Sequence, residues 1–289
     1  MQSVLSQTFS DFEIIIVNDG STDGSEQVIK SFDDKRIKYY TQKNQGAGAA
    51  RNAAIEKATA TYIALMDADD YWYPHYLEEQ YRLIKKYPEE FVFATAQEII
   101  NFNKTYPKTY SLPKDFRDDG VINYFKAGNQ SSLLHSSSTV LKKEVFKQVG
   151  NYNPSIKSGQ DTDLYIRVGL RFSVAFSKKI CSSYYVLENS LFRSSKSLDD
   201  KIDFSKYELL EKENPDLKKF LDLNRFSLAI FAKLHNDSEG FRQNFEKIDL
   251  NNLNKKQRFL LRQPVFVLRM FHRFKSLLLK SGIQLSAFR

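Results

Sequence analysis

The sequence is poor in the residues that crosslink small domains or bind structural zinc. Its 289 residues include one cysteine, Cys181, and four histidines that lie far apart, at positions 75, 135, 235 and 272. An internal disulfide framework is therefore excluded, and the spacing of the histidines matches no zinc-binding motif. A chain of this kind fits a reducing compartment, so we expect a cytoplasmic location.

Long hydrophobic runs are also missing. No stretch of about 18 uncharged apolar residues could span a bilayer, and Met1 to Phe9 lacks the basic start and apolar run of a signal peptide. We therefore expect a soluble protein, or one that is peripheral on the inner face of the cytoplasmic membrane. Hydrophobic residues still make up 42% of the chain and aromatic residues 14%, which is enough for a large core and argues against disorder.

Acidic residues are absent from the last part of the chain. Residues 251–289 contain nine Lys or Arg residues and no Asp or Glu, so the formal net charge of +8 belongs to this tail. A helix over "RQPVFVLRMFHRFKSLLLK" would carry one apolar stripe, formed by Val267, Phe271, Phe274 and Leu278. Its cations would lie nearly opposite, at Arg262, Arg269, Arg273 and Lys280. Such a helix suits an anionic membrane surface, or it packs on the body with its charges in water. No nucleic-acid-binding motif accompanies the charge, so no nucleic acid is expected as a partner.

The first part of the chain alternates between short apolar runs and helix-forming segments. Strands are predicted at 12–17, 36–41 and 62–66, with helices between them. This order predicts an α/β fold with a Rossmann-like, mostly parallel sheet flanked by helices. We expect that domain to cover residues 1–195 and a helical extension, ending in the basic amphipathic helix, to cover 196–289.

Carboxylates follow two of the predicted strands. Asp19 follows the first strand, and Asp67, Asp69 and Asp70 follow the third. Since ligands of such sheets bind at the carboxyl ends of the strands, both turns should face one crevice. Three clustered carboxylates need raised pKa values, a basic partner or a cation such as Mn²⁺ or Mg²⁺. The alternative is a solvated turn that caps the next helix.

Three motifs together resemble family 2 glycosyltransferases, which are inverting enzymes with the glycosyltransferase A-type (GT-A) fold. They are "SQTFSDFEIIIVNDGSTDGS", "NQGAGAARNAAIEKATATYIALMDADDYWYP" and "SGQDTDLYIRV", and the resemblance covers about residues 1–195. The polar and aromatic segment 101–119, between the second and third motifs, has no clear periodicity and is predicted to be a loop over the site.

The resemblance implies a role for individual residues. Asp19 matches the acid that reads the nucleotide base, and Arg51 matches a position near the nucleotide. Asp67 and Asp69 match the first and last acids of the DXD motif, so Asp69 is the expected metal ligand, while Asp67 faces the ribose or also binds the metal. Asp161 matches the catalytic base that takes the proton of the acceptor hydroxyl. Local sequence alone offers simpler interpretations, in which Arg51 is a surface helix residue and Asp161 or Asp163 is a helix N-cap.

The sequence departs from the family pattern at three places. The family usually opens with an apolar strand, whereas "MQSVLSQTF" matches the helix after it, so the neighbouring strand should have an exposed edge. Leu187 stands where the family often has a histidine near the donor phosphates. Gln160 replaces a glutamate beside the expected base.

Ser136 to Ser138 are candidate hydroxyls for an acceptor sugar, and a polar strand end explains them equally well.

The resemblance implies transfer of a sugar from a nucleotide-diphosphate donor, with UDP-sugar expected, to a saccharide or lipid-linked acceptor. The product would be a cell-surface polysaccharide or glycoconjugate. Two alternatives belong to other classes. The first is a non-catalytic remnant that binds nucleotide, membrane or a partner, and the second is a metal-dependent nucleotidyltransferase.

Overall fold

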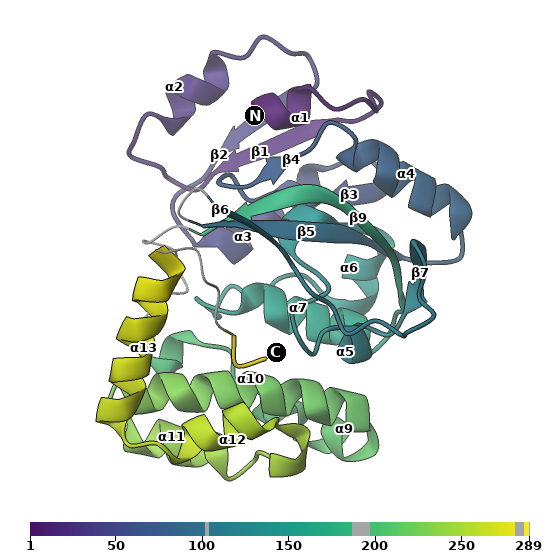
Figure 1. The fold of residues 1–289 in the computed structure, drawn as a ribbon. Helices are drawn as coiled ribbons and strands as arrows, with labels where there is room; N and C mark the ends of the chain where they lie inside the picture. The colour runs from purple at the N-terminus through teal and green to yellow at the C-terminus, as the bar shows by residue number, and fades with distance from the viewer. Residues whose placement is uncertain (102–103, 187–196, 281–285, 289) are drawn as a thin grey trace.

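The computed structural model of the chain describes residues 1–101, 104–186, 197–280 and 286–288, with the backbone alone at positions 276, 277, 279 and 280. The N-terminal elements follow the predicted order (Figure 1). They are α1 (Gln2–Leu5), β1 (Ile14–Asn18), α2 (Ser25–Lys30), β2 (Ile37–Thr41), α3 (Ala47–Lys57) and β3 (Tyr62–Ala64). The three predicted strands are therefore present within a few residues of their expected bounds.

β1 and β2 form a small parallel sheet of their own. In the described part of the chain, β1 pairs with no other strand, so its second edge has no strand partner, as expected from the sequence. Side chains join this sheet to the rest of the molecule instead. Val4 of α1 and Ile14 of β1 pack with Trp72 and Tyr76 in one apolar cluster.

The remaining strands form a larger, mixed sheet. They are β4 (Tyr71–Trp72), β5 (Val92–Asn101), β6 (Lys104–Pro107), β7 (Asp119–Ile122), β8 (Thr139–Lys142) and β9 (Val174–Tyr185). The order is β3-β8-β5-β9-β4, with β6 beside β5 and β7 beside β9. Of these ladders only β5–β9 is parallel. The α/β class is thus confirmed, but the sheet is mixed and not mostly parallel. Strand direction depends on how the connections fold back, which apolar periodicity does not reveal.

Helices cover both faces of the larger sheet (Figure 1). On one face, Phe93 of β5 packs with Leu83 of α4 (Tyr76–Lys86). On the other face, its neighbour Ala94 belongs to the main core with Leu164 of α7 (Gln160–Gly169). Consecutive residues of β5 are therefore buried on opposite sides, as the pleat of a strand requires. This face also holds α5 (Tyr124–Ala127) and α6 (Glu144–Val149).

The segment predicted as a loop over the site is partly a strand. Residues Lys104–Pro107 form β6, which pairs antiparallel with β5. Tyr110, Leu112 and Phe116 then pack against the main core. The loop prediction was wrong for Lys104–Pro107, because pairing with a long neighbouring strand supplied the order that local sequence lacks, whereas residues 108–118 are irregular as predicted.

The C-terminal part is helical, as predicted, and shares the main core. Its helices are α9 (Glu208–Glu213), α10 (Pro215–Leu234), α11 (Ser238–Phe245), α12 (Lys255–Arg262) and α13 (Val265–Lys280). Phe220 of α10 packs against the rings of Tyr124 and Phe125 in α5. Asp163 of α7 accepts hydrogen bonds from Lys206 and Tyr207, and it pairs with Arg167. The division at residue 195 stays a prediction, and the main core crosses it.

The last helix, α13, contacts α10 and stands at one side of the molecule (Figure 1). Leu268 provides the buried contact of this helix, whereas Phe271 and Phe274 of the predicted apolar stripe are exposed. Arg269 bonds the carbonyl of Leu234 at 3.1 Å. Among the described residues, no helix is both long enough and apolar enough to cross a membrane.

Candidate active site

Arg51 lies between the two acidic motifs. Its guanidinium, on α3, donates to Asp67 Oδ1 at 2.6 Å and lies 3.7 Å from Asp161 Oδ1. Burial opposes the cation, but the charges of Asp161 and Asp67 together raise the pKa of Arg51. The guanidinium also lies over the ring of Tyr152, with 5.3 Å to the ring centroid. Arg51 is therefore a partly buried bridge, and the interpretation as a surface helix residue is wrong.

The glycine that precedes α7 sets where this helix begins, and it thereby places Asp161 in the first turn. Gly159, the N-cap residue, has φ +96°, a left-handed conformation that L-residues with a side chain rarely adopt. The helix consequently starts at Gln160, and Asp161 and Asp163 both lie inside the first turn. The N-cap interpretation of either aspartate is therefore wrong, because the chain turns one residue earlier than the capping pattern suggests.

The Asp161 carboxylate is positioned and still accessible. Ser136 donates a hydrogen bond to its Oδ1 at 3.1 Å, and 40% of the side chain is exposed. Burial raises the pKa of Asp161, while the nearby Arg51 cation counteracts that rise. An accessible carboxylate that is oriented by a hydroxyl and a cation can accept a proton from a bound hydroxyl.

The three aspartates after β3 have different surroundings. Asp67 pairs with Arg51, and its backbone N–H donates to Ser137 Oγ at 3.1 Å. Asp69 is exposed at the turn as a whole residue. Partial desolvation of its carboxyl group, together with the charge of Asp67, raises its pKa. Asp70 is buried, and burial raises its pKa to about 7. Two of the three expected means of neutralising clustered carboxylates are therefore present, a basic partner and raised pKa values.

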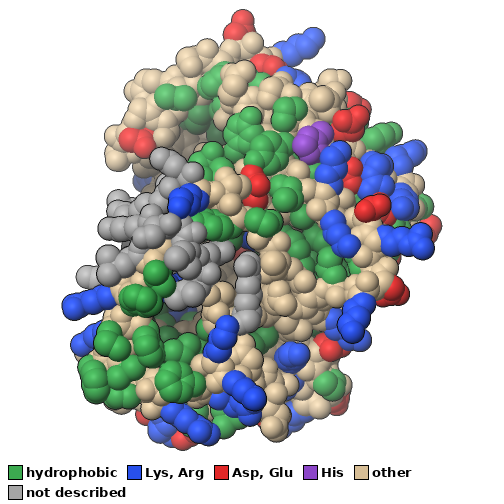
Figure 2. Space-filling view, viewed as in Figure 1, with side chains coloured by type: hydrophobic (Ala, Val, Ile, Leu, Met, Phe, Trp, Pro, Cys, Tyr) green, Lys and Arg blue, Asp and Glu red, His purple; other side chains and the backbone are tan. Residues whose placement is uncertain are grey.

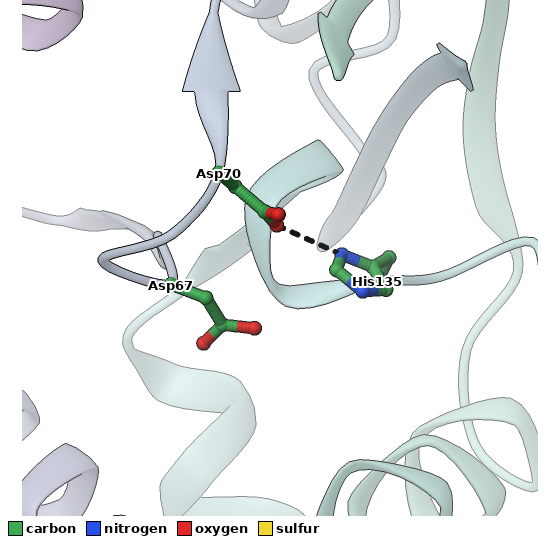
Figure 3. Close-up of side chains that lie close together, drawn as sticks. All are labelled: Asp67, Asp70 and His135. Atoms are coloured by element: carbon green, nitrogen blue, oxygen red, sulfur yellow. Dashed lines mark ion pairs between the residues drawn. The ribbon is translucent and has the colours of Figure 1, made fainter. Parts of the chain in front are cut away.

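Asp70 and His135 point toward one another in the interior of the site (Figure 3). His135 Nδ1 lies 3.8 Å from Asp70 Oδ2, a buried oxygen without a hydrogen-bond partner among the described residues. Burial, with the cations Lys108 and Arg51, holds the pKa of His135 well below its usual range, so the imidazole is neutral. A buried carboxylate oxygen without a partner is costly and is expected to find a proton or a cation.

The residues around this oxygen fit a divalent cation. One ligand atom each from Asp67, Asp70 and His135 lies within 4.8 Å of the others, whereas the predicted ligand Asp69 is outside this cluster. Carboxylate oxygen and neutral imidazole nitrogen together suit Mn²⁺ better than Mg²⁺, which prefers oxygen alone. The assignment of Asp69 as metal ligand stays a prediction.

Ser136, Ser137 and Ser138 are buried, and their hydrogen bonds fix the site. Ser136 orients Asp161, and Ser137 contacts Asp67 through its hydroxyl and Trp72 Nε1 through its carbonyl, at 2.8 Å. Positioning of the acids is therefore the role that their contacts support, and contact with an acceptor sugar stays a prediction.

Asp19 supports the loop before α3. Its two oxygens accept hydrogen bonds from Gln42 Nε2 and from the backbone N–H groups of Gln45 and Gly46, at 2.8 to 2.9 Å. A carboxylate can accept more than three hydrogen bonds, so contact with a nucleotide base stays a prediction.

Gly48, in the first turn of α3, lets α7 approach, because a Cβ there would lie 2.8 Å from Gln160 Oε1. Leu187 lies outside the described residues.

Sequence reasoning placed Asp70 in the acidic cluster without giving it a role of its own, and it did not find His135. Asp70 belongs to the same acidic run as Asp67, so a signal for it was present. His135 had a weaker signal, because it lies 65 positions further along the chain and stands next to the serine run. Only the antiparallel pairing of β8 with β3 and β5 carries the start of β8 to the acidic turn.

The sequence profile of glycosyl transferase family 2 matches residues 1–150. Among curated proteins, an uncharacterised glycosyltransferase of Rickettsia typhi is 28% identical over 180 residues, which are 62% of this chain and 56% of that protein. The chain thus spans little more than half the length of that relative. TuaG of Bacillus subtilis, named for teichuronic acid biosynthesis, is 27% identical over 199 residues, or 68% of this chain and 75% of that protein.

Solved structures show the same fold at low sequence identity. The crystal structure of S. aureus TarS 1–349 in complex with UDP-GlcNAc aligns with a TM-score of 0.58 and 16% identity, covering 85% of each chain. Another structure, of S. aureus TarS, aligns with a TM-score of 0.59 and covers 93% of this chain and 49% of that one. The GT-A fold expected from the sequence motifs is thereby confirmed.

Proposed function

Because this chain belongs to glycosyl transferase family 2, we propose that it transfers one sugar from a nucleotide-diphosphate donor to an acceptor hydroxyl, with inversion at the anomeric carbon. The proposed donor is a UDP-sugar, and the acceptor is a saccharide or a lipid-linked saccharide of the cell surface.

The observation that carries this proposal is the bridge that Arg51 makes between Asp67 and Asp161. The bridge joins the acidic turn after β3 to the first turn of α7, so an acid of the expected donor site and the expected base share one cation. A donor bound at Asp67 would consequently present its sugar near Asp161. This proximity is the requirement for an in-line attack by an acceptor hydroxyl.

In the proposed reaction, Asp161 takes the proton of the acceptor hydroxyl while the acceptor oxygen bonds to the anomeric carbon. The bond from that carbon to the diphosphate breaks, and the nucleoside diphosphate leaves with the bonding electron pair. Ser136 and Arg51 keep the Asp161 carboxylate in position. A positioned base is typically worth about 10² to 10⁴ in rate.

A divalent cation, when bound, would neutralise charge on the departing diphosphate. The residues proposed to hold it are Asp67 and Asp69 of the DXD motif, with Asp70 and His135 as further candidates from the cluster around the buried oxygen. Until the cation binds, Arg51 provides the compensating charge for Asp67.

The donor and product classes are supported by the similar proteins. TarS was crystallised with UDP-GlcNAc and with UDP, which supports a UDP-linked donor. TuaG is named for teichuronic acid biosynthesis, which supports a cell-surface polysaccharide as product. A cytoplasmic location is also proposed, since the single cysteine is a buried free thiol and nucleotide sugars are cytoplasmic donors.

The proposal is tested by calorimetric titration of UDP into the chain, with and without Mn²⁺. We expect binding that requires Mn²⁺ and that Asp69→Ala weakens by tenfold or more, whereas Asp118→Ala, an exposed carboxylate just before β7, leaves it unchanged. GDP and dTDP titrations test the choice of base. A screen of UDP-sugars for release of UDP then identifies the donor.

Further assays on the same protein separate the alternatives. A chain that binds UDP but releases no UDP from any UDP-sugar, in the presence of a pool of bacterial glycolipids and oligosaccharides, would favour a non-catalytic remnant. Consumption of a nucleoside triphosphate with release of pyrophosphate would favour a nucleotidyltransferase. Equal binding of UDP by the unsubstituted chain with and without Mn²⁺ would contradict the metal assignment.

A further inference from the structure

The last helix exposes an apolar face that the packing of the chain does not use. Phe266, Met270 and Phe274 stand at i, i+4 and i+8 of α13 and are 73%, 57% and 55% exposed. On the packed side of the same helix, Leu268 is only 4% exposed. Side chains of this size in one exposed row are unusual for a helix that already has a buried contact.

This row is part of a larger apolar and basic surface, which we call the α13 face and define by Phe259, Phe266, Arg269, Met270, Arg273 and Phe274. All of these except Phe259 line an open hollow of about 460 Å³ on the helix. Figure 2 shows hydrophobic side chains gathered at the lower left, where α13 stands, with Lys and Arg side chains around them.

The two helices that form the α13 face carry cations without acids. Residues 251–289 contain no Asp or Glu, so no acid on α12 or α13 offsets the cations. In the described part of the chain, Arg262 and Arg273 have no ion-pair partner, and Arg269 donates to neutral oxygens, the backbone carbonyl of Leu234 and the side-chain Oδ1 of Asn236. An apolar row flanked by uncompensated cations is complementary to a surface that is apolar inside and anionic outside.

We propose that the α13 face docks on the surface of an anionic phospholipid bilayer, with Phe266, Met270 and Phe274 inserted at the headgroup boundary and Arg269 and Arg273 beside the phosphates. A second copy of the chain fits this surface less well, because a two-fold interface would bring the same arginines of two copies together. The proposal does not depend on sugar transfer, since it concerns binding to lipid alone.

The test is flotation of the full chain with vesicles of phosphatidylcholine alone and of phosphatidylcholine with 30% phosphatidylglycerol, at about 0.1 M and 0.5 M salt. Binding to the anionic vesicles at low salt, weakened at high salt and weak on neutral vesicles, is the expected result. Arg273→Glu removes one favourable charge and adds an unfavourable one, which should lower the partition coefficient roughly 30-fold. Phe266→Ser combined with Phe274→Ser should lower it roughly tenfold or more.

Matched controls lie on α9, at the other end of the helical layer (Figure 1). Leu209→Ser removes an exposed apolar side chain, and Lys212→Glu reverses an exposed charge, so each repeats the chemistry of a test variant away from the α13 face. Both controls should bind like the parent chain. Thermal melting of every variant checks that the fold is kept.

Three results would overturn the proposal. The first is absence of binding to anionic vesicles at low salt. The second is binding that the variants of the α13 face and the α9 controls reduce equally. The third is concentration-dependent self-association in sedimentation experiments that Phe266→Ser with Phe274→Ser abolishes, which would assign the α13 face to a second copy.

Discussion

Replacing Arg51 with glutamine should move the pH dependence of catalysis. In the structure the guanidinium lies 3.7 Å from Asp161 Oδ1 and 2.6 Å from Asp67 Oδ1, and it stabilises the ionised form of Asp161. Without that cation, the Asp161 carboxylate faces the charge of Asp67 and a partly dehydrated environment. The proton on Asp161 is then lost only at higher pH, so the fraction of active base at a given pH falls.

The size of the effect follows from the distance. For unit charges 3.7 Å apart the Coulomb energy is about 4 kcal/mol at an effective dielectric constant near 20, and about 1 kcal/mol in water. Because the Asp161 side chain is 40% exposed and that of Arg51 is 21% exposed, an intermediate value of about 2 kcal/mol is appropriate. This energy corresponds to a rise of roughly 1.5 pH units in the pKa of Asp161.

The assay is kcat/KM for release of UDP from the identified donor, measured from pH 5 to pH 9. The acidic limb of the profile should move up by roughly 1.5 pH units in Arg51→Gln. Arg36→Gln is the matched control, since Arg36 also forms an ion pair with an aspartate, is 25% exposed and lies away from the site. A lower plateau with the acidic limb at the same pH would refute the reasoning, because it would mean that Arg51 serves donor binding alone.

Three further predictions concern the base, the helical part and the pH dependence of stability. Asp161→Asn should lower the rate of sugar transfer by roughly 10² to 10⁴-fold, the typical contribution of a positioned base. Mn²⁺-dependent UDP binding, measured by calorimetry, should stay within about twofold of the parent value. Arg225→Met should destabilise the fold by about 3 to 5 kcal/mol in urea titrations, because buried Glu211 loses its 2.6 Å partner; the exposed Arg242→Met should cost less than about 1 kcal/mol. Burial by itself would raise the pKa of Asp119, but hydrogen bonds from Lys86, Tyr87 and Arg82 lower it to about 2. The stabilisation of the fold by the ionised Asp119 carboxylate is therefore present above pH 4 and is lost as the pH falls toward 2. Asp119→Asn should therefore lower the unfolding free energy by about 2 kcal/mol at pH 7 and by almost nothing at pH 2, and an equal loss at both pH values would contradict the assignment.

The structure also changes the interpretation of two motifs. The serine run at 136–138 was a candidate for contact with an acceptor, whereas its hydroxyls are buried and bond to the acids and to the neighbouring backbone. For the last helix, the sequence left two environments open for the stripe that includes Phe271 and Phe274, an anionic membrane surface or packing on the body. Both rings are exposed, and the helix is buried through Leu268 instead. In both segments the linear pattern identified the residues, and the contacts of the whole fold decided which of them are buried.

The sequence by itself determined the order of elements and the chemical classes at the site. Apolar periodicity placed β1, β2 and β3, because a buried strand needs a continuous run of apolar residues. The acids Asp67 and Asp161 were named from the motifs that resemble the family, and Arg51 was expected near the nucleotide. These properties are local, so a linear pattern can contain them.

Only the tertiary structure decided which residues meet. The direction of β8 carries His135 to Asp70, the left-handed Gly159 turns Asp161 toward Arg51, and the packing of Leu268 exposes the row that starts at Phe266. Each of these outcomes depends on contacts between segments that are distant along the chain or on the choice of one helix face over another. Such contacts are set by how the whole core packs, and no short stretch of sequence contains that information.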